Sequence, residues 1–347
     1  MVDVLVSGGG PSGLAVAIDM AQRGRSVVVV EPHDGTIDKA CGEGLMPGGL
    51  EALDRLGVST LSGMPMEGIT YRQGRRSVSA DFPGRPGLGV RRLTLHEALR
   101  SRAASLGVQW VRDRVKTVDC DDEGVSACGV RARYLVGADG LRSAVRAALF
   151  EELPSRGRPR YAIRQHFHVA PWSPHVEVHW SKHSEAYVTP VAPDTVGVAV
   201  LYDERAKASC SGQGRLFDRL LGAYPEIASR VHTPASTVRG AGPFGVRTRR
   251  VAQGRVLLVG DAAGYVDPLT GEGVGIGLAT AAAACEAIAC EDVAAYPSAW
   301  EQVTRRHRWF AGGLLRLGSV PLIRPLIVPS ACVAPFMMRA AVAGLAR

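Results

Sequence analysis

Apolar positions along the chain follow two periods, and the first 31 residues show both. Residues 2–6 and 26–30 are short apolar runs of strand length, rich in β-branched side chains. Between them, an apolar stretch of helical length runs from Leu14 to Arg23, and Gly24 is placed to end it. The order strand, helix, strand predicts a βαβ unit, the building block of parallel sheets.

The turn of this unit is glycine-rich and reads Gly8-Gly9-Gly10-Pro11-Ser12-Gly13. Gly8 permits a tight turn, Gly10 lets the backbone approach a pyrophosphate, and Gly13 lets the helix pack close to the strand. The free N–H groups and the positive dipole end of the helix would face that pyrophosphate. Glu31 ends the second strand and can accept hydrogen bonds from both ribose hydroxyls. An acid there would repel a 2′-phosphate, so the predicted nucleotide is FAD or NAD rather than NADP.

Two later apolar runs each end in an aspartate beside a glycine. The run 133–138 delivers Asp139-Gly140 before a helix expected at about 141–150, and the run 255–259 ends at Gly260-Asp261. An acid at a strand tip is typical of a site rather than of packing. A glycine- and proline-rich loop then leads into an alanine-rich helix expected over about 273–290. Its glycines, at 271, 273, 275 and 277, would let the helix N-terminus lie against a flat ligand.

Shorter elements lie between these landmarks. A helix is expected to open at Arg92, with Thr94 and Glu97 spaced as a capping box. A strand at 108–111 and a hairpin or meander through 115–118 and 125–127 should follow. A hairpin is expected over 68–82, with its turn at Gln73-Gly74. Four consecutive strand-length runs then predict an antiparallel sheet, at 161–169, 175–180, 185–191 and 195–202.

Composition narrows the class of protein. With 347 residues, 46% of them hydrophobic and 21% charged, the chain can bury the core of a two-domain globular protein. The start runs directly into a strand, so no secretory signal is visible. Seven scattered cysteines without a CxxC pair favour a reducing cytoplasm and argue against a disulfide framework or a zinc site. We therefore expect no metal and a cytoplasmic location.

The net charge of +8 resides mainly in residues 301–347, which hold seven arginines and one acid, Glu301. This segment does not form a nucleic-acid-binding face, and we expect no nucleic-acid partner. It is apolar but broken by prolines, and its longest uncharged stretch, 14 residues between Arg324 and Arg339, is too short to span a membrane. Two interpretations remain open: helices that cover the substrate pocket, which we favour, or an arginine-bearing apolar surface that touches anionic lipid at the membrane periphery.

The three landmarks together resemble the flavoprotein oxidoreductases built like para-hydroxybenzoate hydroxylase. The turn at 8–13 with Glu31 matches their ADP-binding motif, residues 137–146 match their DG motif, and Gly260-Asp261 with Pro268 and Gly271–Gly275 matches their GD motif. Within that superfamily, Lys39-Ala40-Cys41-Gly42 and residues 260–273 look most like the geranylgeranyl reductase branch.

Pattern and resemblance together predict a mixed α/β (α+β) fold. It consists of a Rossmann-like FAD-binding βαβ domain, an inserted antiparallel-sheet substrate domain and C-terminal helices. The FAD-binding domain is discontinuous, with segments 1–67, 90–152 and 241–300. The substrate domain takes 68–89 and 153–240, and a helical tail takes 301–347.

The resemblance also implies the cofactors, FAD and NAD(P)H as reductant, and the residues that hold the flavin. Asp261 would bind the ribityl chain, Arg92 would reach the phosphates or the ribityl chain, and Cys41-Gly42 would lie near the isoalloxazine. The helix starting near Gly273 would face the pyrimidine edge of the ring, where its positive end stabilises the anionic reduced flavin. The full set of cofactor-binding candidates is Gly8, Gly10, Pro11, Ser12, Gly13, Glu31, Cys41, Gly42, Arg92, Val115, Asp139, Gly260, Asp261, Pro268, Gly271, Gly273, Val274 and Gly275.

Two reactions on a hydrophobic small molecule fit this family. We favour a monooxygenase, in which a flavin C4a-hydroperoxide hydroxylates or epoxidises the substrate. The alternative is a geranylgeranyl reductase-type enzyme that passes hydride to a C=C bond. The aromatic-rich strand motif of those reductases is not recognisable in residues 184–190, whereas the segments around Cys41 and 269–273 favour the reductase. A non-catalytic nucleotide-binding protein fits the stretch 260–277 less well.

The sequence offers one candidate catalytic residue. Cys41 is the one candidate, either as a catalytic or gating thiol or, as we favour, as a small apolar residue beside the flavin. His166 and His168 share one strand face, which either lines the pocket or is solvated. Arg142 and Arg146 either attract the nicotinamide cofactor or cap a helix face. Trp180 and Tyr187 are expected in the core or the pocket wall.

Overall fold

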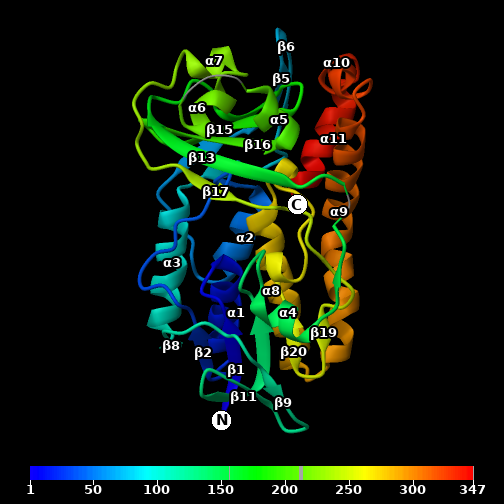
Figure 1. The fold of residues 1–347 in the computed structure, drawn as a ribbon. Coiled ribbons are helices and arrows are strands. Elements are labelled where there is room, and N and C mark those ends of the chain that lie inside the picture. Colours follow the sequence, from blue (N-terminus) through cyan, green and yellow to red (C-terminus); the bar gives the residue numbers. More distant parts are fainter. Residues whose placement is uncertain (156, 211–213, 347) are drawn as a thin grey trace.

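The computed structural model describes residues 1–155, 157–210 and 214–346 (Figure 1). A parallel sheet and a mainly antiparallel sheet lie at opposite ends of an elongated molecule, with helices between and beside them (Figure 1). Arg347 and parts of the predicted substrate domain, residues 156 and 211–213, lie outside the described residues.

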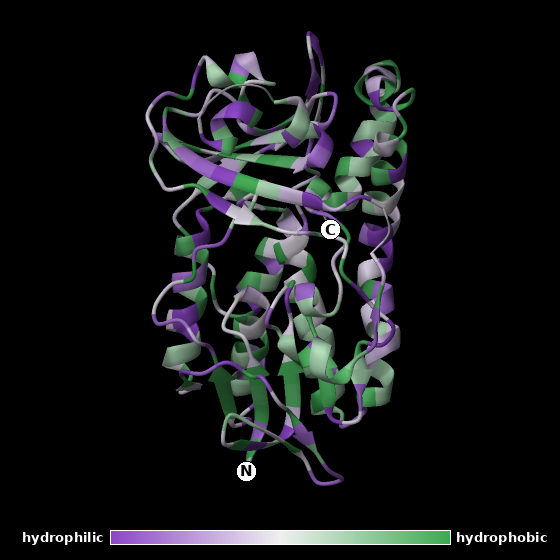
Figure 2. Cartoon of the chain, viewed as in Figure 1, coloured by the Kyte–Doolittle hydropathy of each residue, from purple (hydrophilic) through white to green (hydrophobic). Residues whose placement is uncertain are grey.

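The parallel sheet has the strand order β20-β11-β1-β2-β8, and every neighbouring pair in it is parallel. The predicted βαβ unit is confirmed as β1, α1 and β2. These strands are mainly apolar (Figure 2) because helices α1, α3 and α8 cover the sheet. The elements are β1 (Val2–Ser7), α1 (Pro11–Gln22), β2 (Val27–Val30), α3 (Arg92–Ser105), β8 (Gln109–Val111), β11 (Val130–Gly137), β20 (Val256–Leu258) and α8 (Gly273–Ala289). Three short strands extend it in antiparallel fashion: β9 (Asp119–Cys120), β10 (Val125–Ala127) and β19 (Ala252–Gln253).

The second sheet has seven strands in the order β17-β13-β16-β15-β14-β5-β6. It is antiparallel except where β14 runs parallel to β5. Its strands are β5 (Gly68–Gln73), β6 (Arg76–Asp81), β13 (Arg160–His168), β14 (His175–Trp180), β15 (Ser184–Ala192), β16 (Thr195–Asp203) and β17 (Arg239–Ala241). Helices α5 (Glu204–Ser209), α6 (Leu216–Leu221) and α7 (Pro225–Ala228) pack on one face. The opposite face looks toward the parallel sheet (Figure 1).

Small elements join the two ends. Strands β3 (Gly44–Leu45), β4 (Met64–Met66) and β7 (Gly87–Gly89) form a three-stranded sheet, and β12 (Glu152–Leu153) pairs with β18 (Arg247–Thr248). Helices α2 (Pro47–Arg55) and α4 (Ala144–Leu149) follow glycine-rich loops. Short 3₁₀ turns occupy Gly260–Ala262, Pro268–Thr270, Val293–Ala295 and Arg324–Leu326.

The C-terminal tail consists of α9 (Tyr296–Ser319), α10 (Ile327–Val333) and α11 (Pro335–Leu345). Val328, Met338 and Val342 of α10 and α11 join the apolar cluster on the inner face of the seven-stranded sheet. The tail therefore packs on this face of the sheet. That it covers the substrate pocket stays a prediction. Among the described residues no single helix is long and apolar enough to cross a membrane. The segments Val293–Ser319 and Arg324–Val333 meet that test only as a pair bent by 116°.

Two local predictions are wrong. Residues 115–118 form no strand; Val115 is buried in the main core because its apolar side chain packs there from a loop. The capping box at Thr94 is absent because α3 starts at Arg92, with Arg91 as its N-cap and no side-chain cap. The backbone N–H of Arg92 instead donates to Glu43 Oε1 at 2.8 Å. A carboxylate 49 positions away therefore takes the place of the local cap.

The mixed α/β fold class is confirmed. The domain boundaries remain a prediction, supported by the fact that β5, β6 and β13–β17 all belong to the seven-stranded sheet.

Candidate flavin and substrate site

The strand ends predicted to bind the nucleotide meet at one edge of the parallel sheet. Gly8 follows β1, Glu31 follows β2 and Asp139 follows β11, and ligands of open α/β sheets bind at such carboxyl ends. Gly8 has φ +104°, and a Cβ there would lie 2.6 Å from the carbonyl oxygen of Ala138. A Cβ at Gly13 would overlap the carbonyl oxygen of Gly8. The chain geometry thus requires glycine at both positions.

Glu31 lies beside the glycine-rich turn. Its Oε2 accepts from the backbone N–H of Gly9 at 2.8 Å, and its Oε1 contacts His33 Nδ1 at 2.7 Å. Burial acts to raise the pKa of Glu31, but the hydrogen bonds from Gly9 and His33 outweigh it and hold the pKa below its ordinary value. The group is therefore ionised at neutral pH, as the predicted ribose contact requires.

The nucleotide cradle carries buried polar atoms without protein partners. Helix α1 begins after Gly10 with no side-chain cap, so the first-turn N–H groups are open to a ligand. An ideal Cβ on Gly10 would be 4.0 Å from Arg92 Nη2. Within the described residues, Arg92 Nε and Asp139 Oδ1 are buried and lack hydrogen-bond partners. An FAD pyrophosphate and its sugar hydroxyls supply the acceptors and donors that these atoms need, so the residues present fit FAD.

Asp261 lies at the third strand end. Burial raises the pKa of Asp261, and the charges of Arg92, Lys39 and Arg146 oppose that rise. A Cβ on Gly260 of this turn or on Gly277 of α8 would overlap the Ser12 hydroxyl of α1. Glycine at both positions therefore lets the turn and α8 pack closely against α1. Gly273 lies against Tyr265, and Gly275 against Gly49. The glycines of α8 thus serve protein packing in addition to any ligand.

The loop 267–272, which joins Asp261 to α8, is held by residues from three other elements. Tyr187 Oη donates to the carbonyl oxygen of Leu269 at 2.6 Å. Arg160 Nε lies 3.0 Å from Asp267 Oδ2. His307 Nδ1 of α9 lies 3.1 Å from Thr270 Oγ1 and 3.0 Å from Glu272 Oε2. The seven-stranded sheet and the tail therefore both fix this loop.

A series of buried ion pairs runs from Asp267 in that loop, through Arg160 and Glu185, to Arg324 in the tail. Glu185 is fully buried and contacts Arg160 at 2.5 Å and Arg324 at 2.6 Å. Arg324 also donates to the carbonyl oxygens of Ser181 and Ser184. Burial raises the pKa of Asp267 to about 6, with Glu185 adding to the rise and Arg160 opposing it. Sequence reasoning missed Asp267, Arg160 and His307 because their partners are remote in the chain.

Cys41 is a poor nucleophile in this setting. Burial raises the pKa of the Cys41 thiol. Its Sγ accepts from the backbone N–H of Glu43 at 3.4 Å, and the neighbouring Gly42 carbonyl accepts from Thr189 Oγ1 at 2.7 Å. A protonated thiol held by its own loop favours the interpretation of Cys41 as a small wall residue.

The two arginines of the DG motif have different surroundings. Arg146 is buried and donates to the carbonyl oxygens of Leu141 at 2.7 Å and Ala262 at 3.0 Å. It therefore connects the DG and GD motifs structurally. Arg142 is exposed and donates to the carbonyl oxygen of Gly242 at 3.5 Å.

The two histidines predicted to share a strand face, His166 and His168, differ in exposure. His166 is buried on the inner face of the seven-stranded sheet, whereas His168 at the end of the same strand is exposed. No group of three or more His, Cys, Asp or Glu side chains in the described part of the chain is arranged to hold a metal ion.

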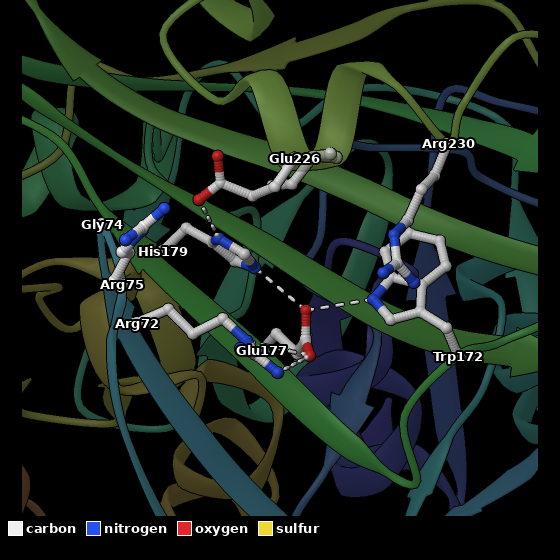
Figure 3. A pocket seen from close by; sticks show the side chains of 9 residues that line it. Arg72, Gly74, Arg75, Trp172, Glu177, His179, Glu226 and Arg230 are labelled. Carbon is white, nitrogen blue, oxygen red and sulfur yellow. Dashed lines mark hydrogen bonds and ion pairs between the residues drawn. The ribbon is translucent and has the colours of Figure 1, made fainter.

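A cavity of about 420 Å³ opens on the other side of this sheet (Figure 3). Glu177 and His179 of β14 point into it, while Val176 and Val178 alternate with them and face the inner cluster. Glu177 joins Arg72, Trp172 and His179 in one network (Figure 3). Since none of the predicted flavin-site residues lines it, the cavity is separate from the flavin site.

Comparison with known proteins decides the family. A family model described as an FAD binding domain matches residues 1–299. The chain belongs to this FAD-binding family. It is an FAD-dependent oxidoreductase of the para-hydroxybenzoate hydroxylase-like superfamily, and the motif resemblance is confirmed at that level.

Relatives of this FAD-binding enzyme carry different activities. Menaquinone reductase of Mycolicibacterium smegmatis is 29% identical, over 88% of this chain and 80% of the relative. Para-nitrophenol 4-monooxygenase of a Pseudomonas species is 27% identical, over 82% and 77%. A probable FAD-dependent monooxygenase from Pseudomonas aeruginosa shares the fold with a TM-score of 0.73 at 21% identity, over 99% of each chain.

Proposed function

We propose that the protein is an FAD-dependent monooxygenase that uses NAD(P)H and acts on a hydrophobic small molecule. The observation that carries the substrate class is the apolar cluster on the inner face of the seven-stranded sheet. It reaches from the sheet to the cofactor loop and includes Met46, Tyr187, Phe244 and Leu269. A relative that is a para-nitrophenol 4-monooxygenase supports the reaction class.

The chain's own residues bind, orient and exclude water. The α1 N-terminus, Glu31, Arg92 and Asp139 would hold the nucleotide. Tyr187 fixes the loop beside the flavin, and the apolar cluster keeps water from the reacting atoms. FAD, when bound, supplies hydride acceptance and the oxygen chemistry.

A C=C reductase of the geranylgeranyl reductase type is the second candidate. It is favoured by the relative that is a menaquinone reductase and by the loop around Cys41. Both reactions use NAD(P)H, but only the monooxygenase consumes oxygen.

Oxygen uptake during turnover separates the two. The purified protein with FAD and NAD(P)H would be supplied with p-nitrophenol or a menaquinone as the first probes. We expect substrate-dependent oxygen uptake equal to NAD(P)H oxidation, with one atom of labelled oxygen in the product. Product formed at the same rate without oxygen would contradict the monooxygenase and support the reductase.

We also infer that the tail contacts anionic lipid at a membrane surface. Apart from Met1, every large exposed apolar side chain of the described residues lies in the tail: Trp309, Leu317, Val320, Leu322, Ile323, Leu326, Val333, Phe336 and Met337. Arg305, Arg308, Arg316 and Arg339 are exposed in the same helices, and no acid occurs between residues 302 and 347. Exposed apolar area flanked by arginine and free of acids matches an anionic bilayer surface.

Vesicle sedimentation tests this contact. We expect binding to phosphatidylglycerol vesicles and much weaker binding to phosphatidylcholine vesicles. Leu322→Glu combined with Phe336→Glu should abolish it, whereas Gln253→Glu, which adds a negative charge on β19 outside the tail, should not. Equal binding by all three proteins, or none by the wild type, would contradict the inference.

A further inference from the structure

We propose that the cavity on the outer face of the seven-stranded sheet, the face that carries α5–α7, binds a carboxylate attached to a small apolar body. Its wall is formed by β14, the loop before β14, the turn between β5 and β6, and the segment 226–230 around α7. Its volume of about 420 Å³ lies within the range of about 300–1,000 Å³ that small-molecule sites occupy. The inference is independent of the proposed reaction, because no predicted flavin-site residue lines the cavity.

The floor of the cavity is a buried polar network on β14. Glu177 and His179 are 2% and 3% exposed. Glu177 Oε1 accepts from Nε and Nη2 of Arg72 at 3.1 and 2.9 Å. Its Oε2 accepts from Trp172 Nε1 at 3.1 Å and lies 3.0 Å from His179 Nε2 (Figure 3). Burial acts to raise the pKa of Glu177, but the hydrogen bonds from His179 and Trp172 and the charge of Arg72 lower it to about 2. The carboxylate is therefore ionised and already paired, so the floor does not attract a cation.

The positive charges at the mouth of the cavity are not paired. Arg75 in the hairpin turn and Arg230 after α7 both line the cavity and are exposed. Across the described residues, neither guanidinium makes a hydrogen bond or an ion pair. Arg230 lies over the ring of Trp172, 4.9 Å from its centroid, which holds it at the wall. Figure 3 shows Arg75 on one side of the Glu177 network and Arg230 on the other. The donors of both arginines are therefore open to a ligand.

The charge and shape of the lining define the class of ligand. Three arginines and two glutamates line the cavity, so with a neutral His179 the excess is one positive charge. This excess matches a single negative charge. A guanidinium presents its donors as a planar fork, which fits the two oxygens of a carboxylate. Trp172 and Ile227 provide apolar surface in the same wall. A monocarboxylate with a small apolar body satisfies both parts of the lining.

Holding the hairpin in place does not account for these arginines. Residues 68–72 of β5 already pair in register with residues 175–179 of β14, and β5 and β6 form their own antiparallel ladder. Arg72 adds its ion pair with Glu177 to these backbone contacts. Arg75 and Arg230 add no ion pair within the part of the chain that the structure describes. Their charges are therefore available to a bound anion.

Titration of the FAD-loaded protein with benzoate, followed by saturation-transfer NMR, tests the site. Benzamide has the same shape without the charge and should bind at least about tenfold more weakly, as expected when charge-assisted hydrogen bonds are lost. Arg75→Gln and Arg230→Gln should each weaken benzoate binding several-fold. Arg76→Gln is the matched control, because Arg76 is exposed on the same hairpin and does not line the cavity.

A variant of opposite sign separates the site from general damage to the fold. Glu226 lines the cavity with a side chain that is 46% exposed, and its negative charge opposes an anion. Glu226→Gln should therefore tighten benzoate binding several-fold. No saturable benzoate binding, equal binding of benzamide, or equal binding by Arg230→Gln would overturn the proposal. Benzoate binding that shifts the flavin absorbance and is unaffected by all three substitutions would place the ligand at the flavin and overturn it as well.

Discussion

The phenol of Tyr187 on β15 donates a 2.6 Å hydrogen bond to the carbonyl oxygen of Leu269, which joins the substrate-side sheet to the loop beside the predicted flavin. Both residues are buried. Together with the ion pair between Arg160 and Asp267, this hydrogen bond positions the cofactor loop relative to the sheet that bears the substrate face.

Tyr187→Phe should therefore destabilise the protein by about 1–2 kcal/mol, because a buried carbonyl oxygen loses its donor. Substrate-dependent turnover should fall more than FAD affinity, since the cradle at Gly8–Gly13 is untouched. Urea unfolding and FAD titration measure the two effects. Tyr202→Phe, on the neighbouring strand β16, is the control and should change neither.

Asp267 makes a definite contribution to the pH dependence of stability. Its pKa rises from 3.8 to about 6 on folding, so the folded state holds the proton more tightly than the unfolded state. This group therefore stabilises the fold at pH values below 3.8, and the contribution is lost as the pH rises to about 6. The loss is on the order of 2–3 kcal/mol.

Asp267→Asn should remove that dependence, so the difference in unfolding free energy between variant and wild type should grow from pH 4 to pH 6.5. Measuring both proteins across this range cancels the titration of the other carboxyls. Asp194→Asn, at an exposed position, should run parallel to the wild type. Parallel curves for Asp267→Asn as well would refute the raised pKa.

Arg324→Gln should cost about 3 kcal/mol or more of unfolding free energy. It leaves the fully buried Glu185 with Arg160 alone and removes donors from three backbone carbonyls. Arg316→Gln changes an exposed arginine of α9 and should stay within about 0.5 kcal/mol of the wild type. Thermal unfolding of the two variants side by side measures the contrast.

Cys41→Ala should retain most of the turnover, since burial keeps the thiol protonated and removes its nucleophilic character. Cys128→Ala, at a half-buried cysteine outside the site, is the matched control. A loss of more than about a hundredfold in Cys41→Ala alone, as expected for a missing nucleophile or general acid, would restore Cys41 as a catalytic residue.

The parts of the structure that were predictable from sequence are local. The β1-α1-β2 unit, the Asp139 and Asp261 strand ends and the hairpin at 68–82 depend on contiguous patterns of apolar residues and glycine. The contacts that complete the site are not local. Glu43 meets His166 across 123 positions, and Tyr187 meets Leu269 across 82. No periodicity encodes such pairs, so the local pattern at Thr94 predicts a capping box, whereas a remote carboxylate caps α3.

The central claim is that one FAD molecule occupies the edge where β1, β2 and β11 end, and titration of the purified protein with FAD tests it most directly. Gly13→Ala places a Cβ on the carbonyl oxygen of Gly8 and should weaken FAD binding at least tenfold, about 1.4 kcal/mol. Gly312→Ala, where a Cβ meets open space in α9, should bind as the wild type does. We predict one equivalent of FAD per wild-type chain and a shifted flavin absorbance. No spectral change at saturating FAD, or equal binding by Gly13→Ala, would contradict the account.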